Sequence, residues 1–354
     1  MASEIILGYK VKLFPTRAKA DTLALLARVF QRSFSDATTS IAAMDHPRIP
    51  PCKGKGEFTG RAYRRAHTDW RRSLKAAKKA GRTFTAPTLR AELIDAVHVQ
   101  SPRKAKHFDL WVMVQGVGKL YLPARKHRAL NRALAYPGAT LCEQGEVFRK
   151  NEKWYCRVGV KVPLPDEQPV KEWIGCDVGV RRAITCSDGY QGPDLRPILD
   201  KRQQREADQK RHLHDAEVDS LTAPRQAQAR EARTLLSRAQ RSGRGIALEN
   251  PRSLPKWRQW SAKFFAQRIL LLAALAGVPV SLVRPAYTSL TCSRCGEVGQ
   301  TFRNKTMFRC LRCRFTANAD RNAALNIAYR AHRISCGSHH GLLRRSLLGG
   351  GIVE

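Results

Sequence analysis

The chain contains 354 residues, enough for two or three folded modules, and its apolar fraction is ordinary for a globular protein. Its charge is the outlier, because 64 Lys and Arg residues against 29 Asp and Glu residues give a formal net charge of +35. A typical small domain carries a net charge of only about 2–8, so we expect nucleic acid as the partner rather than a merely basic, soluble surface.

The opening segment and the cysteine usage favour a protein that stays inside the cell. Residues 1–15 carry charges and lack the cationic lead and cleavage pattern of a secretory signal. No apolar run reaches the roughly 18–20 residues that a membrane span needs. Six of the ten cysteines are scattered singly, which is typical of a reducing compartment. We therefore expect a cytoplasmic, nucleoid-associated protein with no membrane partner.

The first residues indicate a strand followed by a long helix. Ile5–Phe14 alternates apolar and polar side chains and ends at Pro15, which is the pattern of a strand. From Arg17 to Ala43 the apolar residues recur at helical spacing. They are Leu23, Leu26, Ala27, Phe30, Phe34, Ala37 and Ile41. Residues 47–60 are rich in Pro and Gly and predict a loop.

Residues 61–82 predict a strongly basic helix that contains a single acid, Asp69, and two interleaved aromatic residues, Tyr63 and Trp70. A run of charge is usually a solvated face. Because balancing acids are nearly absent here, we favour a helix that follows a phosphate backbone. Its candidate nucleic-acid contacts are Arg61, Arg64, Arg65, Arg71, Arg72 and Lys75.

Residues 108–162 return to the pattern of short strands. Their second half predicts a hairpin that turns at Arg149–Lys153 between alternating flanks. We expect a small β-barrel that the first strand joins, with the helices of residues 17–105 inserted into it. Three prolines within residues 163–169 then mark a linker.

Beyond the linker, residues 172–333 alternate strands and helices. Residues 195–241 predict charged helices interrupted near Pro224, for which a solvated pair and a nucleic-acid contact both remain open. The segment after Arg333 predicts a mobile tail. The expected strands are Trp173–Val178, Arg182–Ser187, Gly245–Glu249 and Val278–Val283, and the expected helix between the last two is Ser261–Ala276.

Four cysteines form the most specific motif in the sequence. Two Cys-x2-Cys pairs stand fourteen residues apart, a spacing typical of a zinc ribbon, and four thiolates indicate one structural rather than catalytic Zn²⁺. Gly296 follows the first pair, where the backbone often needs a positive φ, whereas Arg314 replaces the usual glycine after the second. Basic residues such as Arg309 suggest that the ribbon contacts phosphates. The ligands are Cys292, Cys295, Cys310 and Cys313.

Three acids stand at the ends of predicted elements. Asp177 and Glu249 each close an apolar strand, and Asp320 begins a helix with a small, alanine-rich face. Each has an ordinary alternative: a turn former for Asp177, an exposed strand end for Glu249 and an N-cap for Asp320. Together they fit the converging carboxylates that hold two divalent metals for phosphodiester hydrolysis, with Mg²⁺ or Mn²⁺ as the preferred ions.

The order strand-Asp, strand-Glu, four-cysteine ribbon and Asp-x-Asn-Ala-Ala resembles the split RuvC nuclease of the TnpB family. These are transposon-encoded RNA-guided endonucleases related to the miniature type V CRISPR effectors. Residues 289–327 carry the most specific resemblance, and residues 175–189 and 246–250 also match. The opening Tyr-Lys-Val-Lys-Leu-Phe-Pro-Thr resembles the family's first strand and helix start. Residues 45–165 resemble the family only in order and charge.

The resemblance implies an α+β multidomain fold. Residues 1–16 and 106–168 would form a wedge-like β-barrel, and residues 17–105 an inserted helical recognition lobe. Residues 172–288 and 317–333 would form an RNase H-like (RuvC) nuclease domain. The inserted zinc ribbon, residues 289–316, would contact target nucleic acid, and residues 334–354 would form a disordered tail.

The resemblance also implies an activity and partners. Asp177, Glu249 and Asp320 would hold two Mg²⁺ or Mn²⁺ ions and cleave double-stranded target DNA. The protein would bind a guide RNA as a monomer and read a short motif beside the target, while the guide reads the rest. Two alternatives are a nuclease-inactive RNA-guided repressor and a zinc-ribbon nucleic-acid-binding protein without a guide. One departure is that Thr306 stands where many relatives carry an arginine four residues before the third cysteine.

Overall fold

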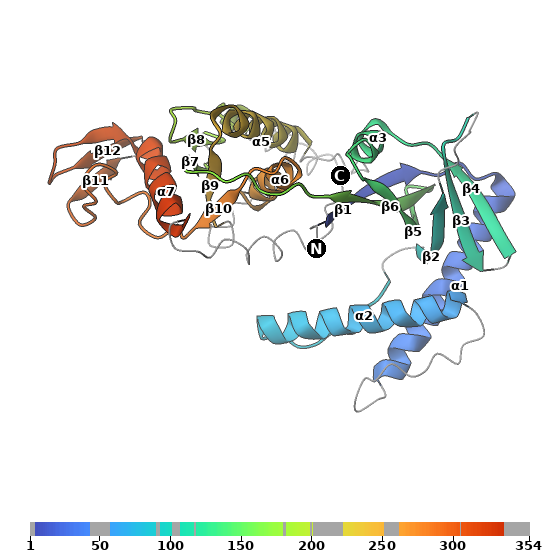
Figure 1. Ribbon diagram of the computed structural model, residues 1–354. Helices are drawn as coiled ribbons and strands as arrows, with labels where there is room; N and C mark the ends of the chain where they lie inside the picture. The colour runs from blue at the N-terminus through green and yellow to red at the C-terminus, as the bar shows by residue number, and fades with distance from the viewer. Residues whose placement is uncertain are drawn as a thin grey trace. The chain divides into compact units, whose positions relative to one another are not determined.

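The computed structural model describes residues 4–42, 57–89, 93–100, 107–116, 118–179, 182–198, 200, 222–250, 262–304 and 306–335. Apart from a few terminal residues, the chain divides into two compact units, Glu4–Pro163 and Leu164–Gly350. The two are described separately below, with the labels of Figure 1. Within the described ranges, no helix combines the length and the apolar character that crossing a bilayer requires.

The first unit is built on a six-stranded antiparallel sheet in the order β1-β6-β5-β2-β3-β4 (Figure 1). Its two edge strands meet at one end, where Leu13 forms a bridge with Ala124 and the Phe14 amide donates to Pro123 O at 3.0 Å. The strands are β1 (Glu4–Lys12), β2 (Leu93–Gln100), β3 (Leu110–Gly116), β4 (Gly118–Ala124), β5 (Thr140–Lys150) and β6 (Lys153–Pro163).

The alternating segments of the first unit fold as predicted. β1 buries every second side chain against the sheet core. The hairpin at residues 149–153 is confirmed, because Lys150 pairs with Lys153 across a two-residue turn. Asn151 and Glu152 form that turn with φ of 48° and 61°, the left-handed values that match the twist of a hairpin.

The helices of the first unit are α1 (Arg17–Ala42), α2 (Glu57–Ala80) and α3 (Arg128–Leu134). All seven apolar residues that the helical spacing selected in α1 are buried. Tyr63 and Trp70 pack on the cluster that α1 and α2 share, so these aromatic residues of the basic helix serve packing. The hydrophobic face of α2 therefore points at α1 and leaves its arginines on the other side.

Two predictions for the first unit need correction, and one short helix has no counterpart among the predictions. The helical lobe was expected to run to residue 105, but Leu93–Gln100 is a strand that pairs with β3 and β5. The loop expected at residues 47–60 ends earlier, because α2 begins at Glu57. The short helix α3 was not predicted, because seven residues give too few turns for a clear period.

The second unit is built on a four-stranded sheet in the order β10-β9-β7-β8, in which β7, β9 and β10 run parallel and β8 is antiparallel. The predicted strands are confirmed, although the second is only two residues long. The charged segment 195–241 contributes α5, and most of its first half lies outside the described residues. The elements are β7 (Trp173–Asp177), β8 (Thr185–Cys186), α5 (Thr222–Ser242), β9 (Gly245–Glu249), α6 (Ala262–Leu275), β10 (Val280–Val283) and α7 (Ala319–Ser335).

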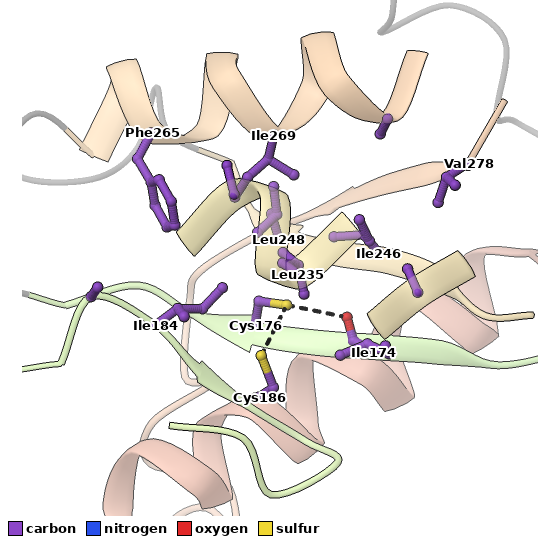
Figure 2. Close-up of a cluster of buried hydrophobic side chains, with 14 of the residues drawn as sticks. Ile174, Cys176, Ile184, Cys186, Leu235, Ile246, Leu248, Phe265, Ile269 and Val278 are labelled. Carbon is purple, nitrogen blue, oxygen red and sulfur yellow. Dashed lines mark hydrogen bonds between the residues drawn. The ribbon is translucent and has the colours of Figure 1, made fainter. Parts of the chain in front are cut away.

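Side-chain alternation gives this sheet two different faces. One face carries Ile174 and Cys176 of β7 and Ile246 and Leu248 of β9, which pack with α5 and α6 in the core shown in Figure 2. The other face meets α7, where Trp173 and Ala247 pack with Ile327 and Ala331. Because strand side chains alternate, Asp177 and Glu249 belong to the α7 face.

α7 approaches β7 so closely that only glycine fits at position 175. A Cβ there would lie 2.0 Å from the carbonyl oxygen of Ala324 and 2.4 Å from the amide nitrogen of Ala328. Ala323 and Ala324 are buried at this contact. The small face of the helix and the glycine of the strand therefore act together to bring the start of α7 to the sheet edge.

Gly175→Ala should destabilise the second unit by about 2–4 kcal/mol, because the added methyl must displace helix backbone. Circular dichroism during thermal unfolding would measure this. Gly299→Ala is the matched control, since a Cβ at Gly299 meets only a side-chain oxygen at 3.6 Å. Equal melting temperatures for the two variants would contradict the close-packing argument.

Candidate active site

The structure brings the three predicted acids to one edge of the sheet in the second unit. Cys176 pairs with Leu248 in the parallel register of β7 and β9, so the next residues, Asp177 and Glu249, end their strands at the same level. Both belong to the α7 face, and Asp320 lies in the first turn of α7. Three segments that are far apart in the sequence thus supply one carboxylate each.

The N-cap of α7 is Asn318, which decides one alternative for Asp320. The Asn318 Oδ1 atom accepts hydrogen bonds from the amides of Asp320 and Arg321, both at 3.0 Å. This is the pattern of an N-cap side chain. The Asp320 carboxylate is therefore not needed for capping, and it accepts instead from Arg303 Nη2 at 3.2 Å.

The electrostatics of the site disfavour the ionised forms of Asp177 and Glu249. Burial, together with the neighbouring carboxylates Glu249 and Asp320, raises the pKa of Asp177 to about 7. Burial also raises the pKa of Glu249, although the Thr288 hydroxyl and nearby arginines act in the opposite direction. Like charges placed this close favour binding of a cation.

The donor set of these three acids fits divalent ions that prefer oxygen. Among the described residues, only the four ribbon cysteines bring three or more candidate ligand atoms within 4.8 Å of one another, so the carboxylates are more widely spaced. A site for two ions about 3.5–4 Å apart does not require all ligand oxygens to converge on one point. Carboxylate oxygens are the ligands that Mg²⁺ and Mn²⁺ prefer.

Arg303 is a site residue that the sequence did not reveal. It stands on β11 (Thr301–Asn304), pairs with Phe308 of β12 (Met307–Cys310), and reaches Asp320. Its charge also lowers the pKa values of Asp177 and Glu249. Thr306, at the position where an arginine was expected, contributes its backbone carbonyl to the Ala319 amide at 2.8 Å. Only the register of the β11–β12 hairpin could have pointed to Arg303.

The four cysteines fit a tetrahedral zinc site. The Sγ atoms of Cys292 and Cys313 are 3.7 Å apart, as are those of Cys295 and Cys310. Zinc–sulfur bonds of about 2.3 Å in a tetrahedron require sulfur atoms about 3.8 Å apart. The ribbon sheet continues through β13 (Thr316–Asn318), two residues beyond the predicted end of the ribbon.

The backbone turns after the two cysteine pairs have the same handedness. Gly296 has a φ of 77°, as predicted, and Arg314 has a φ of 58° in the equivalent turn. A non-glycine residue in this region is strained by roughly 1–2 kcal/mol. Arg314 nevertheless adopts the same turn as Gly296, so Cys313 keeps its place beside the other three cysteines.

Two asparagines of α7 fasten the ribbon to the candidate site. Asn322 accepts from the Ser293 amide at 2.9 Å and donates to Thr291 O at 2.8 Å. One helical turn later, Asn326 donates to Thr288 O at 2.9 Å and to Thr291 O at 2.7 Å. Both asparagines are buried. The only sign of this in the sequence is that two polar residues stand on the otherwise apolar face of the helix. These hydrogen bonds tie the ribbon segment to the helix that carries Asp320.

The residues predicted to contact nucleic acid divide into several groups. In the first unit, one pocket of about 550 Å³ is lined by four of the predicted arginines. Arg71 and Lys75 of α2 are exposed but do not line it, and Arg309 is exposed on β12 in the other unit. The four arginines are Arg61, Arg64, Arg65 and Arg72.

Asp177→Asn should stabilise the metal-free protein above neutral pH. The folded state keeps the Asp177 proton up to about pH 7, whereas the unfolded chain loses it near pH 4, so stability falls as pH rises between these values. Asn cannot ionise, so the variant avoids this loss. Its free energy of unfolding should exceed that of the wild type by about 1–3 kcal/mol at pH 8 and should equal it near pH 4. Thermal melts across this pH range would measure the difference.

Added Mg²⁺ supplies a second reading of the same variant. Mg²⁺ should raise the melting temperature of the wild type at pH 8 more than that of Asp177→Asn, because ligand binding stabilises only the chain that binds it. Asp166→Asn, which changes an exposed acid of the same unit, serves as control. A pH profile of Asp177→Asn parallel to that of the wild type would contradict the raised pKa.

Cys310→Ser should lose the bound zinc and loosen the start of α7, because Asp320 follows the ribbon directly. Elemental analysis should show about one zinc per wild-type chain and clearly less in the variant. Hydrogen exchange should become faster at residues 319–326. Cys142→Ser, which removes a thiol of the other unit, should change neither. Full zinc content in Cys310→Ser would contradict the assignment.

Comparison with known proteins finds the same segment. Residues 263–327 match the family described as Cas12f1-like, TNB domain. The chain is 41% identical over 70 residues to the CRISPR-associated endodeoxyribonuclease Cas12f1 of Sulfoacidibacillus thermotolerans, which covers 20% of this chain and 17% of that protein. It is 34% identical over 83 residues to a TnpB-like protein of Aquifex aeolicus, which covers 22% and 27%. The matches thus span less than a third of these curated relatives.

Solved structures extend the likeness to the whole fold. Cas12f1 in a cryo-EM complex with sgRNA and target DNA matches with a TM-score of 0.61 at 16% identity, over 88% of this chain and 83% of that chain. The mini-RNA-guided endonuclease CRISPR-Cas phi3 matches with a TM-score of 0.56 at 10% identity, over 96% and 93%. The sequence likeness at the ribbon and the likeness of fold agree with the predicted resemblance: the chain is similar to Cas12f1 proteins and to a TnpB-like protein.

Proposed function

We propose that the protein is an RNA-guided DNA endonuclease that cuts beside a short motif read by the protein itself. The observation that carries this proposal is the convergence of Asp177, Glu249 and Asp320 at one sheet edge, with burial and mutual repulsion raising the pKa of Asp177. The names of the relatives support it, since they include an endodeoxyribonuclease and a TnpB-like protein.

In this proposal Asp177, Glu249 and Asp320 are the metal ligands and therefore the catalytic residues. Two Mg²⁺ or Mn²⁺ ions held there would activate a water molecule and stabilise the leaving oxygen. Thr288 orients Glu249 through its hydroxyl, and Asn318 orients the first turn that presents Asp320. Arg303 neutralises Asp320 in the metal-free chain, and it lies where a guanidinium could donate to a phosphate oxygen of bound DNA.

The remaining domain assignments belong to the same proposal. The bridge between the edge strands of the six-stranded sheet supports a wedge-like β-barrel, and α1 with α2 supports a recognition lobe. The parallel β7-β9-β10 sheet with an acid at two strand ends supports an RNase H-like (RuvC) nuclease domain. The basic zinc ribbon would contact target DNA.

The partners in this proposal are a guide RNA and double-stranded DNA, with one protein chain bound to each RNA. The net charge of +35 supports backbone contacts to both nucleic acids. Such contacts carry no sequence information, so base pairing with the guide would supply the specificity. The solved neighbour with sgRNA and target DNA supports the same pair of partners.

Asp177→Ala should abolish Mg²⁺-dependent cleavage of a matched plasmid while leaving binding of RNA and target within about threefold of wild type. The assay uses protein purified with its own RNA, which is sequenced first to define the target. Asp166→Ala serves as the matched acidic control. Cutting at the wild-type rate by Asp177→Ala would overturn the site assignment.

The same experiment separates the two alternatives. If the protein is a nuclease-inactive repressor, the wild type itself would bind the matched target without cutting it. Such a repressor would be expected to have lost one of the three acids, and all three are present here. A guide-independent zinc-ribbon protein would retain no single RNA species after a high-salt wash, because non-specific phosphate contacts weaken steeply with salt.

A further inference from the structure

Two irregularities in the sheet of the first unit lie on either side of strand β5, one in its pairing with β2 and one in its pairing with β6. Ile94 pairs with Val147 and Val97 with Gly145, so Asp95 and Ala96 of β2 face Glu146 alone. On the other side of β5, residues 142–144 face Gly159 alone. Bulges of this kind bend a strand and redirect its side chains, and they are enriched next to functional sites.

The two bulges direct Asp95 and Gln144 toward the arginine face of α2. Both residues line the 550 Å³ pocket, together with Arg61, Arg64, Arg65, Thr68 and Arg72. Ligand pockets generally measure about 300–1,000 Å³, so this one has room for a nucleotide. All of its lining residues belong to the first unit, and the candidate active site belongs to the second.

Arg65 holds this pocket together and is not itself available to a ligand. Its guanidinium lies 2.8 Å from Asp69, 3.4 Å from Asp95 and 3.3 Å from Glu146, and Arg157 also contacts Glu146. One arginine is thus surrounded by three acids. The predicted role of Arg65 as a phosphate contact is better described as structural: it fixes α2 to the bulged strands.

Two other arginines of the pocket, Arg64 and Arg72, are exposed to solvent. Arg64 is exposed and has no carboxylate partner within the described part of the chain. The Arg72 side chain is 74% exposed and has one contact to Asp69 at 3.3 Å. Arg61 donates to the Asp95 carbonyl at 3.2 Å, which fixes the bulge. Arg64 and Arg72 are therefore the cations that an anionic ligand would meet.

A pocket for phosphate alone would not contain a carboxylate, because Asp95 repels an anion. Burial raises the pKa of Asp95 although Arg65 acts to lower it, so its charge is incompletely compensated. A further hydrogen-bond donor would stabilise the carboxylate. Gln144 is exposed, lines the same pocket and can donate or accept. A phosphate joined to a group bearing a hydroxyl suits both the exposed arginines, Arg64 and Arg72, and the polar pair Asp95 and Gln144.

We propose that this pocket binds one ribonucleotide of an RNA chain and distinguishes RNA from DNA. Arg64 and Arg72 contact the flanking phosphates, and Asp95 and Gln144 receive the ribose 2′-hydroxyl, the group by which a protein can tell the two nucleic acids apart. The proposal rests on the proposed function in one respect, namely that RNA is a partner. It adds the residues that select RNA chemically.

The test compares an oligouridine with an oligo-2′-deoxyuridine of equal length, which differ only in the 2′-hydroxyl. Fluorescence anisotropy at near-physiological salt, without added divalent cation, gives both affinities. Wild type should prefer the ribose form. Gln144→Ala and Asp95→Asn should each reduce that preference by about threefold or more, since the first removes one hydrogen bond and the second replaces a charged acceptor by a weaker neutral one.

Arg64→Gln should weaken both oligonucleotides alike, by about three- to tenfold, and lower the salt dependence by about one counterion. Lys79→Gln, an equal charge change on the last turn of the same helix, should have a smaller effect than Arg64→Gln. Because Asp95→Asn weakens the ion pair with Arg65, thermal melts must show that this variant stays folded at the assay temperature. Gln144→Ala tests the pocket without changing that ion pair.

Two results would overturn the proposal. Equal losses for both oligonucleotides in Gln144→Ala and Asp95→Asn would show that the pocket reads phosphate only. No loss in Arg64→Gln beyond that of Lys79→Gln would show that the pocket is not a binding site. Neither result depends on cleavage, so failure of the proposed nuclease activity is measured separately, through Asp177→Ala on plasmid DNA.

Discussion

The contact between β7 and α7 is the constraint on which the second unit depends. Gly175 lets the helix backbone lie directly on the strand, and the alanines of α7 provide the matching surface. This contact sets the distance between Asp177, at the end of the strand, and Asp320, at the start of the helix. Asn322 and Asn326 then fix the ribbon to the same helix. A single close approach therefore positions both the third carboxylate and the zinc site.

Burial destabilises the ionised forms of Asp177 and Glu249 at this edge, and the apolar packing around them compensates. One face of the sheet is closed by α5 and α6, and the other by α7, so every strand is held from both sides (Figure 2). A half-buried carboxylate such as Asp177 can persist there because the strand cannot retreat from its neighbours. Arg303 reduces the repulsion, as its effect on the pKa of Asp177 shows.

The large positive charge is used in two different ways. Arg65 and Arg157 both form ion pairs with Glu146 and belong to the structure of the first unit. Arg64 and Arg72 remain exposed and are available to a polyanion. The same residue type on α2 thus fixes the fold at Arg65 and faces solvent at Arg64 and Arg72. A count of basic residues indicates the class of partner, and only the positions of the acids show which arginines are free to meet it.

The sequence by itself determined the features that depend on local spacing: the buried stripe of α1, the turn at residues 149–153, the cluster of four cysteines and the three acids at element ends. It could not place Arg303, Asn322 or Asn326, because their partners are remote in the chain and become neighbours only through strand register and helix packing. The tertiary structure alone decided that Asn318 caps α7 and that residues 93–100 join the sheet. Local patterns specify which surfaces are apolar, and the long-range contacts decide which polar groups face one another.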